Sequence, residues 1–221
     1  MIILLFGPPG CGKGTQAVHI ARRFGIPAVS TGELFRAAAK AGTGLGKMAA
    51  SIMASGQLVP DDVTNGIVAE RISAPDCAGG FLLDGYPRTL PQAETFASIL
   101  ASKGLAEPIV IHLDVPAEAL VARLTARRQC PVCKTIYNVH SQPPKVEGKC
   151  DVDGAGLITR ADDREAAIRE RLRAYEALTE PILGWYGASR VYRIDGNMAP
   201  GAVRGAIDET ILKTAGAAVK A

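Results

Sequence analysis

Short apolar runs recur along the chain and alternate with longer segments in which apolar residues follow a helical spacing. The apolar runs are Met1–Phe6, Ile26–Val29, Gly80–Leu83, Ile109–Leu113 and Val191–Ile194. Runs of this length are typical of strands that are buried on both faces, as in a parallel sheet. Their alternation with helices predicts an α/β fold in which helices cover a parallel sheet on both sides.

Several of the intervening helices have recognisable start signals. Ser30 followed by Glu33 has the pattern of a capping box, in which the two side chains bind backbone N–H groups at the start of a helix. Asp61 or Asp62 is expected to cap the next helix, and Pro91 suits the first turn of a third.

One region interrupts this alternation. Residues 130–156 contain several prolines and glycines and only short β-like pieces such as Thr135–Val139, so we expect an insertion without a helix. Helical periodicity returns over Asp163–Glu180. The Ala- and Gly-rich end, Thr214–Ala221, is expected to fray.

Composition and charge narrow the class of protein. The 221 residues are 48% hydrophobic and 21% charged, which suits one large domain or one domain with insertions. No stretch approaches the roughly 18 apolar residues of a membrane span, and the opening apolar run lacks the basic leader of a signal peptide. A net charge of +3 is too small to indicate a nucleic-acid partner. We therefore expect a cytoplasmic protein with neither a membrane nor a nucleic-acid partner.

The clearest motif directly follows the first apolar run. Residues Gly7–Thr15 read GPPGCGKGT and join a predicted strand to a predicted helix. Glycines in such a loop let successive N–H groups converge on a polyphosphate at the positive end of the helix, and Lys13 would add a full charge near the β- and γ-phosphates. The hydroxyl that commonly follows the lysine and ligates Mg²⁺ comes one position later, at Thr15. The spacing of Gly7, Gly12 and Lys13 between a strand and a helix favours a nucleoside triphosphate site over an ordinary glycine-rich turn.

Two further segments could act together with this loop. Asp84 ends an apolar run, and ligands of open α/β sheets bind beyond the carboxyl ends of the strands, so Asp84 would face the loop and hold Mg²⁺ through waters. Thr31 and Arg36 belong to a predicted helix N-terminus that could bind a second phosphate-bearing molecule. Taken alone, Asp84 also fits a plain turn, and the segment with Thr31 and Arg36 more often means a capped helix with a solvated arginine.

The insertion carries the pattern of a metal site. Cys130 and Cys133 form a C-x-x-C pair, and after sixteen residues Cys150 and Asp153 repeat the spacing with a carboxylate in the last position. Two such pairs predict a tetrahedral zinc site, which is structural because protein fills all four positions. The sequence does not decide whether the bound metal is zinc or iron, nor whether Asp151 can replace Asp153 as the fourth ligand. The odd number of cysteines, five, fits a reducing compartment.

These motifs occur in the order seen in adenylate kinases, and the resemblance covers nearly the whole chain. Besides the phosphate loop it rests on Ser30–Gly32 with Arg36, Gln57–Asp61, Gly80–Gln92, Asp114–Pro116 and Thr159–Asp163. It implies a P-loop NTPase-type parallel sheet flanked by helices, with three parts. These are a core of residues 1–29, 60–125 and 164–221, an AMP-binding flap of residues 30–59, and a zinc-bearing lid of residues 126–163 that closes over ATP.

The resemblance also implies which residues bind each nucleotide. ATP would be held by Gly10, Cys11, Gly12, Lys13, Gly14, Thr15, Arg127, Ile136, Tyr137 and the backbone near Met198. AMP would be held by Thr31, Arg36, Gln57, Leu58, Val59, Gly85, Tyr86, Pro87, Arg88, Gln92, Arg160 and Arg171. The catalytic set would be Lys13, Asp84, Arg88, Arg123, Arg160 and Arg171, because transfer between two anions needs positive charge around the migrating phosphoryl group.

The activity that the resemblance implies is phosphoryl transfer from Mg²⁺-ATP to AMP, giving two ADP, by a monomer. One alternative is a UMP or CMP kinase on the same scaffold, against which Thr31, Val59 and Gln92 favour adenine by resemblance. The other is a nucleotide- and zinc-binding module without turnover. Such a module would not need Lys13, Asp84 and a complete set of arginines.

Overall fold

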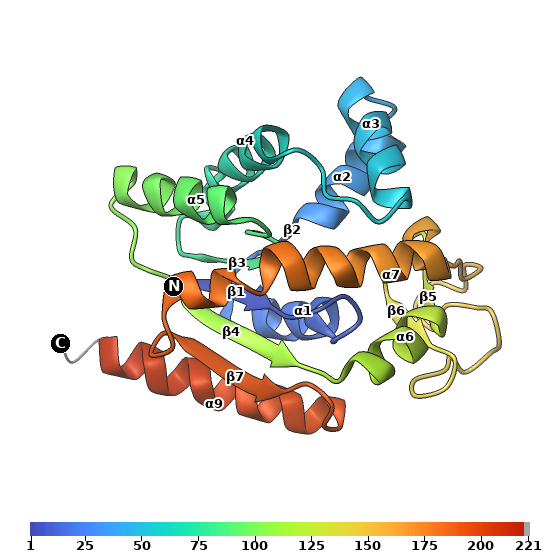
Figure 1. Ribbon diagram of the computed structural model, residues 1–221. Coiled ribbons are helices and arrows are strands. Elements are labelled where there is room, and N and C mark those ends of the chain that lie inside the picture. Colours follow the sequence, from blue (N-terminus) through green and yellow to red (C-terminus); the bar gives the residue numbers. More distant parts are fainter. Residues whose placement is uncertain (219–221) are drawn as a thin grey trace.

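A five-stranded parallel sheet forms the centre of the computed structural model, which describes residues 1–218 (Figure 1). The strands lie in the order β2-β3-β1-β4-β7, and each of the five predicted strands is present within two residues of its expected limits. Their bounds are β1 Ile2–Phe6, β2 Ala28–Ser30, β3 Phe81–Asp84, β4 Ile109–Asp114 and β7 Val191–Asp195.

Helices connect these strands and cover both faces of the sheet. Their bounds are α1 Lys13–Phe24, α2 Thr31–Lys40, α3 Gly44–Ala54, α4 Asp61–Ile72, α5 Leu90–Ser102, α6 Ala117–Thr125, α7 Glu165–Ala174, α8 Ile182–Tyr186 and α9 Pro200–Ala218. None of the described helices combines the length and the apolar character that crossing a membrane requires.

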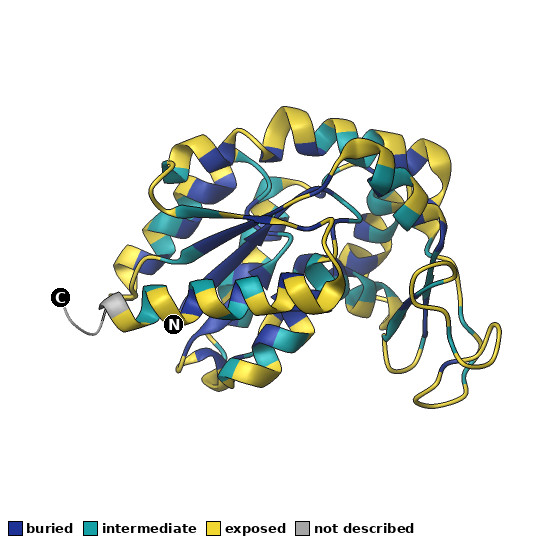
Figure 2. Cartoon of the chain, turned by 90° about the horizontal axis from the view of Figure 1, so that it is seen from below, coloured by how far each residue is buried: buried dark blue, intermediate teal, exposed yellow. Residues whose placement is uncertain are grey.

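The apolar character of the central strand β1 follows from this covering. Ile2, Leu4 and Phe6 are buried in a cluster with side chains of α4, α5 and α8, whereas Ile3 and Leu5 are buried in a second cluster with α1, α6 and α9. Both faces of the strand therefore exclude water, and the sequence shows a continuous apolar run instead of an alternating one. The central strands of the sheet are accordingly mostly buried (Figure 2).

Two segments extend from the carboxyl end of the sheet. Helices α2 and α3 follow β2 and pack against one another, which gives the predicted flap a helical structure. The insertion after α6 begins with an antiparallel hairpin of β5, Arg127–Gln129, and β6, Ile136–Asn138. In this part of the described chain no α-helix forms before α7, in line with its prolines and glycines.

The predicted helix caps are wrong in their details. Ser30 precedes α2, as expected, but its side chain binds no N–H group of the helix, and Glu33 does not complete a capping box. Asp61 and Asp62 lie inside the first turn of α4 and do not cap it. The carboxylates of Glu33 and Asp61 instead contact residues far away in the sequence, as described below.

The C-terminal third differs from expectation in two places. The periodic segment predicted over Asp163–Glu180 is helical from Glu165 and passes from α7 into a π-helical turn, Tyr175–Thr179. Fraying of the chain end is wrong for Thr214–Ala218, which continue α9. The rest of that prediction, residues 219–221, lies outside the described residues.

Candidate functional site

A cavity of about 1000 Å³ lies at the carboxyl ends of the parallel strands. It is lined by four parts of the chain: the phosphate loop, helix α2 with the end of α3, the β5–β6 hairpin, and the loop before α9. A space of this size holds two small ligands or one extended ligand. The predicted residues that line it are Gly10–Thr15, Arg36, Gln57, Asp84, Gly85, Pro87, Arg88, Arg123, Arg127, Ile136, Tyr137, Arg160, Arg171 and Met198.

Five residues expected at the AMP site lie behind the lining. Thr31, Val59, Tyr86 and Gln92 are buried, and Leu58 is half-buried. Two of them hold lining residues in place: the Thr31 hydroxyl donates to the Gly85 carbonyl at 2.8 Å, and the Gln92 Oε1 accepts from the Arg88 backbone N–H. The structure therefore separates groups that face the cavity from groups that hold those in place.

The phosphate loop owes its shape to glycine. Gly7 has φ +142°, and a Cβ at this position would lie 2.6 Å from the carbonyl oxygen of Leu113, so no other residue fits. Helix α1 begins at Lys13, directly after Gly12 in the left-handed conformation. The Lys13 ammonium donates to the carbonyls of Gly7 at 2.5 Å and Pro8 at 2.9 Å. A cation and a helix N-terminus thus meet at the cavity, which favours an anionic ligand.

Asp84 and the lid hairpin both approach this loop. Strand register places Asp84 opposite Leu5, and its Oδ2 lies 3.9 Å from the position that a Cβ on Gly14 would occupy. The Cδ1 of Ile136, from β6, lies 3.6 Å from the same position. The Asp84 carboxylate and an apolar side chain of the β5–β6 hairpin therefore both lie next to the start of α1.

Seven arginines line the cavity, and five of them, from distant parts of the sequence, act on one another or on shared carboxylates: Arg36, Arg88, Arg127, Arg160 and Arg171. Burial, reinforced by the charge of Arg127, lowers the pKa of both Arg160 and Arg171 to about 10. Burial also lowers the pKa of Arg88, and the nearby charge of Arg36 acts in the same direction. Guanidinium groups that are desolvated and repel one another form a site in which an anion is stabilised.

Glu33 is a site residue that the sequence analysis missed. Its Oε1 accepts hydrogen bonds from Arg36 at 2.6 Å and from Arg160 at 3.3 Å, and Gln129 donates to it at 3.5 Å. Burial opposes ionisation of the carboxyl, but the hydrogen bond and charge of Arg36, with the charge of Arg160, hold its pKa below the usual value. Because Glu33 lies on the flap and its other two partners on the lid, this carboxylate connects the two segments.

Asp162 and Asp163 are the second omission. Arg171 pairs with Asp162 at 3.0 Å and with Asp163 at 3.3 Å, and the Arg127 Nε donates to Asp163 at 2.8 Å. The Asp163 side chain is fully buried, so it fixes both guanidinium groups in position. In the sequence, the only signal for this role was that two adjacent carboxylates follow Arg160 closely, next to a predicted site residue.

Arg123 contacts a different part of the wall. Its guanidinium donates to the Gly196 carbonyl and to the Asn197 side chain, both at 3.0 Å. These residues begin the loop that includes Met198 and leads into α9. Arg123 thereby fixes the loop whose backbone, near Met198, the resemblance assigns to the ATP site.

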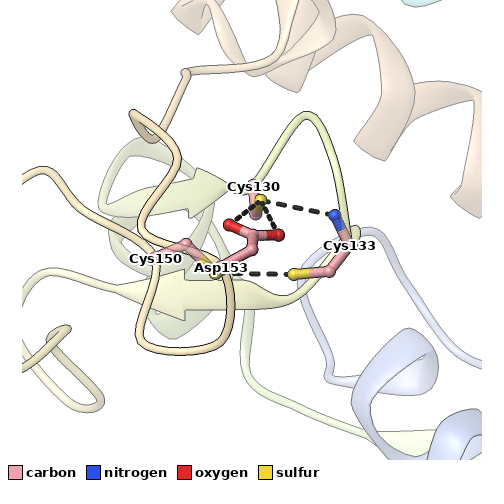
Figure 3. A group of neighbouring side chains, drawn as sticks. All are labelled: Cys130, Cys133, Cys150 and Asp153. Carbon is pink, nitrogen blue, oxygen red and sulfur yellow. Dashed lines mark hydrogen bonds between the residues drawn. The ribbon is translucent and has the colours of Figure 1, made fainter.

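The predicted metal ligands converge in the lid (Figure 3). The sulfur and oxygen atoms of Cys130, Cys133, Cys150 and Asp153 lie within 4.8 Å of one another. The Sγ atoms of Cys133 and Cys150 are 3.4 Å apart, and that of Cys130 lies 3.3 Å from the carboxylate. Three sulfurs and one carboxylate suit zinc, and four such ligands leave no open position. Asp151 is not part of this group, since its carboxylate accepts from a backbone N–H elsewhere in the loop.

Comparison with known proteins finds relatives over most of the chain. A family model described as adenylate kinase matches residues 5–191. The adenylate kinase of Oceanobacillus iheyensis is 52% identical over 84% of this chain and 86% of that protein. The adenylate kinase of Moorella thermoacetica is 49% identical over 92% of this chain and 94% of its own length. That of Syntrophomonas wolfei is 46% identical over 96% of this chain and 99% of its own.

Proposed function

This chain belongs to the adenylate kinase family and catalyses phosphoryl transfer from Mg²⁺-ATP to AMP, giving two ADP, and we propose that both nucleotides bind in the cavity described above. The observation that carries the proposal is the meeting of a phosphate loop with five converging arginines in one cavity. The proposal favours AMP as the acceptor over UMP or CMP, and turnover over simple binding, in keeping with the names of the relatives.

ATP occupies the phosphate-loop side in this proposal. The N–H groups of residues 10–15 bind its phosphates, and the Lys13 ammonium moves from the loop carbonyls to the β- and γ-phosphates. The loop at Met198 receives the base, while Ile136 and Tyr137 cover the nucleotide. Thr15 and Asp84 would hold the Mg²⁺ that accompanies ATP, and the ion supplies positive charge to the phosphate oxygens.

AMP occupies the flap side. Arg36 and Arg88 bind its phosphate, and Gln57 lines the space for its base. Arg160 and Arg171 lie between the two nucleotides and neutralise the migrating phosphoryl group. Because no covalent intermediate is needed, the contribution of these residues is alignment and charge.

Glu33 has a defined part in this arrangement. In the closed arrangement that the structure describes, its carboxylate is the counter-ion of Arg36 and Arg160. A phosphate carries more negative charge and more acceptor oxygens than a carboxylate, so it displaces Glu33 from these guanidinium groups. The salt bridges to Glu33 hold both guanidinium groups in position, so less ordering is needed when the phosphate binds.

We also propose that Cys130, Cys133, Cys150 and Asp153 hold one structural zinc ion. The apolar cluster of the lid is small: it consists of Cys130, Tyr137 and Cys150, with Ala155 and Leu157 packed against them. A segment with so little core commonly needs a metal to fix its shape. The zinc ion would join the two loops of the lid and take no part in the reaction.

The remaining proposals concern the setting of the enzyme. All five cysteines are free thiols, which is compatible with the reducing cytoplasm. Both nucleotide sites are built from a single chain, so a monomer is sufficient for activity. We propose a cytoplasmic, monomeric enzyme of nucleotide biosynthesis without a nucleic-acid or membrane partner.

Closure of the flap and lid over the nucleotides tests the two-site proposal. The flap contacts α7, since a Cβ on Gly56 would lie 2.5 Å from the carbonyl oxygen of Ala167, and Glu33 contacts the lid. Repulsion among the arginines opposes this arrangement until phosphates bind, so the free enzyme is expected to be more open.

We expect the radius of gyration from solution scattering to fall when a bisubstrate analogue is added, in which a polyphosphate chain joins two adenosines. AMP alone, which fills only the flap side, should give a smaller decrease. A radius of gyration that stays the same with the linked molecule would contradict closure over two sites.

A further inference from the structure

A group of hydrogen bonds behind the flap side of the cavity centres on Asp61. Its Oδ1 accepts from the Gln92 amide at 2.7 Å, and its Oδ2 accepts from the Thr89 hydroxyl at 2.8 Å. Asp61 is the first residue of α4, and the other two residues start α5. Both oxygens of one carboxylate are therefore used to hold the start of a second helix.

These contacts fix the orientation of the Gln92 amide. Gln92 is 1% exposed, and its Oε1 accepts from the backbone N–H of Arg88 at 2.8 Å. The backbone N–H can only donate and the Asp61 carboxylate can only accept, so the amide oxygen must face Arg88 and the amide nitrogen must face Asp61. Neither contact survives if the amide turns over.

These contacts fix the position of Arg88. Its backbone nitrogen is bound by Gln92, its carbonyl accepts from Thr179 at 2.9 Å, and its Nε donates to the Gly85 carbonyl at 2.8 Å. The Nε contact directs the guanidinium along the cavity wall. A shift of the backbone at Arg88 would displace the guanidinium by a similar amount, enough to weaken a bidentate contact with phosphate.

We propose that Asp61 is a positioning residue for AMP: its carboxylate fixes Gln92, and Gln92 fixes the backbone of Arg88 so that the guanidinium meets the AMP phosphate. This inference rests on the AMP site proposed above. A cap of α4 is not the role of Asp61, since the structure gives its side chain no hydrogen bond to that helix.

Two variants of Asp61 separate positioning from folding. Asp61→Leu has a similar size and no acceptor, and we expect about a tenfold rise in KM for AMP with KM for ATP unchanged. Asp61→Asn keeps an oxygen for Gln92 and can donate to Thr89, so its KM for AMP should stay within about threefold of wild type. The melting temperature of each variant checks that it is folded.

A double-mutant cycle tests the route through Gln92. Gln92→Glu places a second carboxylate against Asp61, and the repulsion should raise KM for AMP about tenfold or more. In that background Asp61→Asn can donate to the introduced carboxylate, which still accepts from the Arg88 N–H. We therefore expect Asp61→Asn to lower KM for AMP in the Gln92→Glu enzyme, although it slightly raises KM in the wild type.

Three results would overturn the inference. They are an Asp61→Leu enzyme with a normal KM for AMP, an Asp61→Leu enzyme in which KM for AMP and KM for ATP rise together, and an Asp61→Asn effect that is equal in both backgrounds.

Arg88→Ala distinguishes an error in the proposed AMP site from an error in the positioning role of Asp61. If Arg88→Ala leaves KM for AMP unchanged, the AMP site itself is wrong and the inference falls with it. If KM rises but the coupling is zero, only the role of Asp61 is wrong.

Discussion

Lys13→Met is expected to lower kcat by about 10³-fold in protein that remains folded. The Lys13 ammonium is the cation at the start of α1, and its present partners are two carbonyls of the phosphate loop itself. In the transition state it would neutralise charge on the phosphate oxygens, whereas methionine fills the space without a charge. Steady-state ADP formation and circular dichroism provide the measurement.

Arg88→Ala should lower kcat to a similar extent. Arg88 acts on the AMP side of the cavity, where its guanidinium is desolvated in the wall. Arg169→Ala is the matched control, since Arg169 is 64% exposed and, within the described part of the chain, pairs only with Glu165 one turn away on α7. A surface pair of this kind contributes little, so its kcat should be unchanged. Near-normal turnover of a folded Lys13→Met or Arg88→Ala enzyme would remove the assigned roles.

Loss of the metal ligands has the second large expected effect. Cys130→Ser or Cys150→Ser should abolish stoichiometric zinc binding and lower the melting temperature by about 10 °C, which corresponds to about 3 kcal/mol for a chain of this length. The expected loss is smaller than the whole zinc-binding energy, because the apolar cluster of the lid is separate from the two clusters that stabilise the parallel sheet. Activity should persist in the cold, since the metal does not enter the reaction.

Two conservative variants sharpen the metal assignment. Asp153→Cys should keep one zinc ion per chain, because a thiolate is at least as good a zinc ligand as a carboxylate. Asp151→Asn is the control: its carboxylate lies outside the group of four ligands, and metal content should not change. Wild-type protein purified without chelator and free of metal would refute the zinc site without affecting the kinase activity.

The features that the sequence predicted well depend on local chemistry. The central strands were visible because burial on both faces makes them largely apolar runs, as β1 shows, whereas the edge strands β2 and β7 are less buried. The phosphate loop was visible because Gly7 and Lys13 are needed at fixed spacing. The four metal ligands were visible for the same reason, and the structure brings them together.

The features that were missed depend on partners far away in the chain. Glu33 and Arg160 are separated by 127 positions, so no local pattern reveals that they pair. The same carboxylate was interpreted as half of a capping box, and Asp61 as a helix cap, because local rules assign a polar side chain to its nearest N–H groups. Burial of Gln92 behind the cavity wall likewise follows from packing of α5 against α4, which spacing alone does not predict.

The acceptor dependence of ADP formation tests the central claim most directly. With ATP and Mg²⁺ present, AMP should be converted so that two ADP appear for each ATP consumed, and kcat/KM should exceed that for UMP or CMP by about 100-fold or more. Without a monophosphate, hydrolysis of ATP should be negligible, because the closed cavity excludes water. Equal turnover with UMP or CMP, or ADP formation that does not depend on AMP, would contradict a cavity built to hold ATP and AMP together.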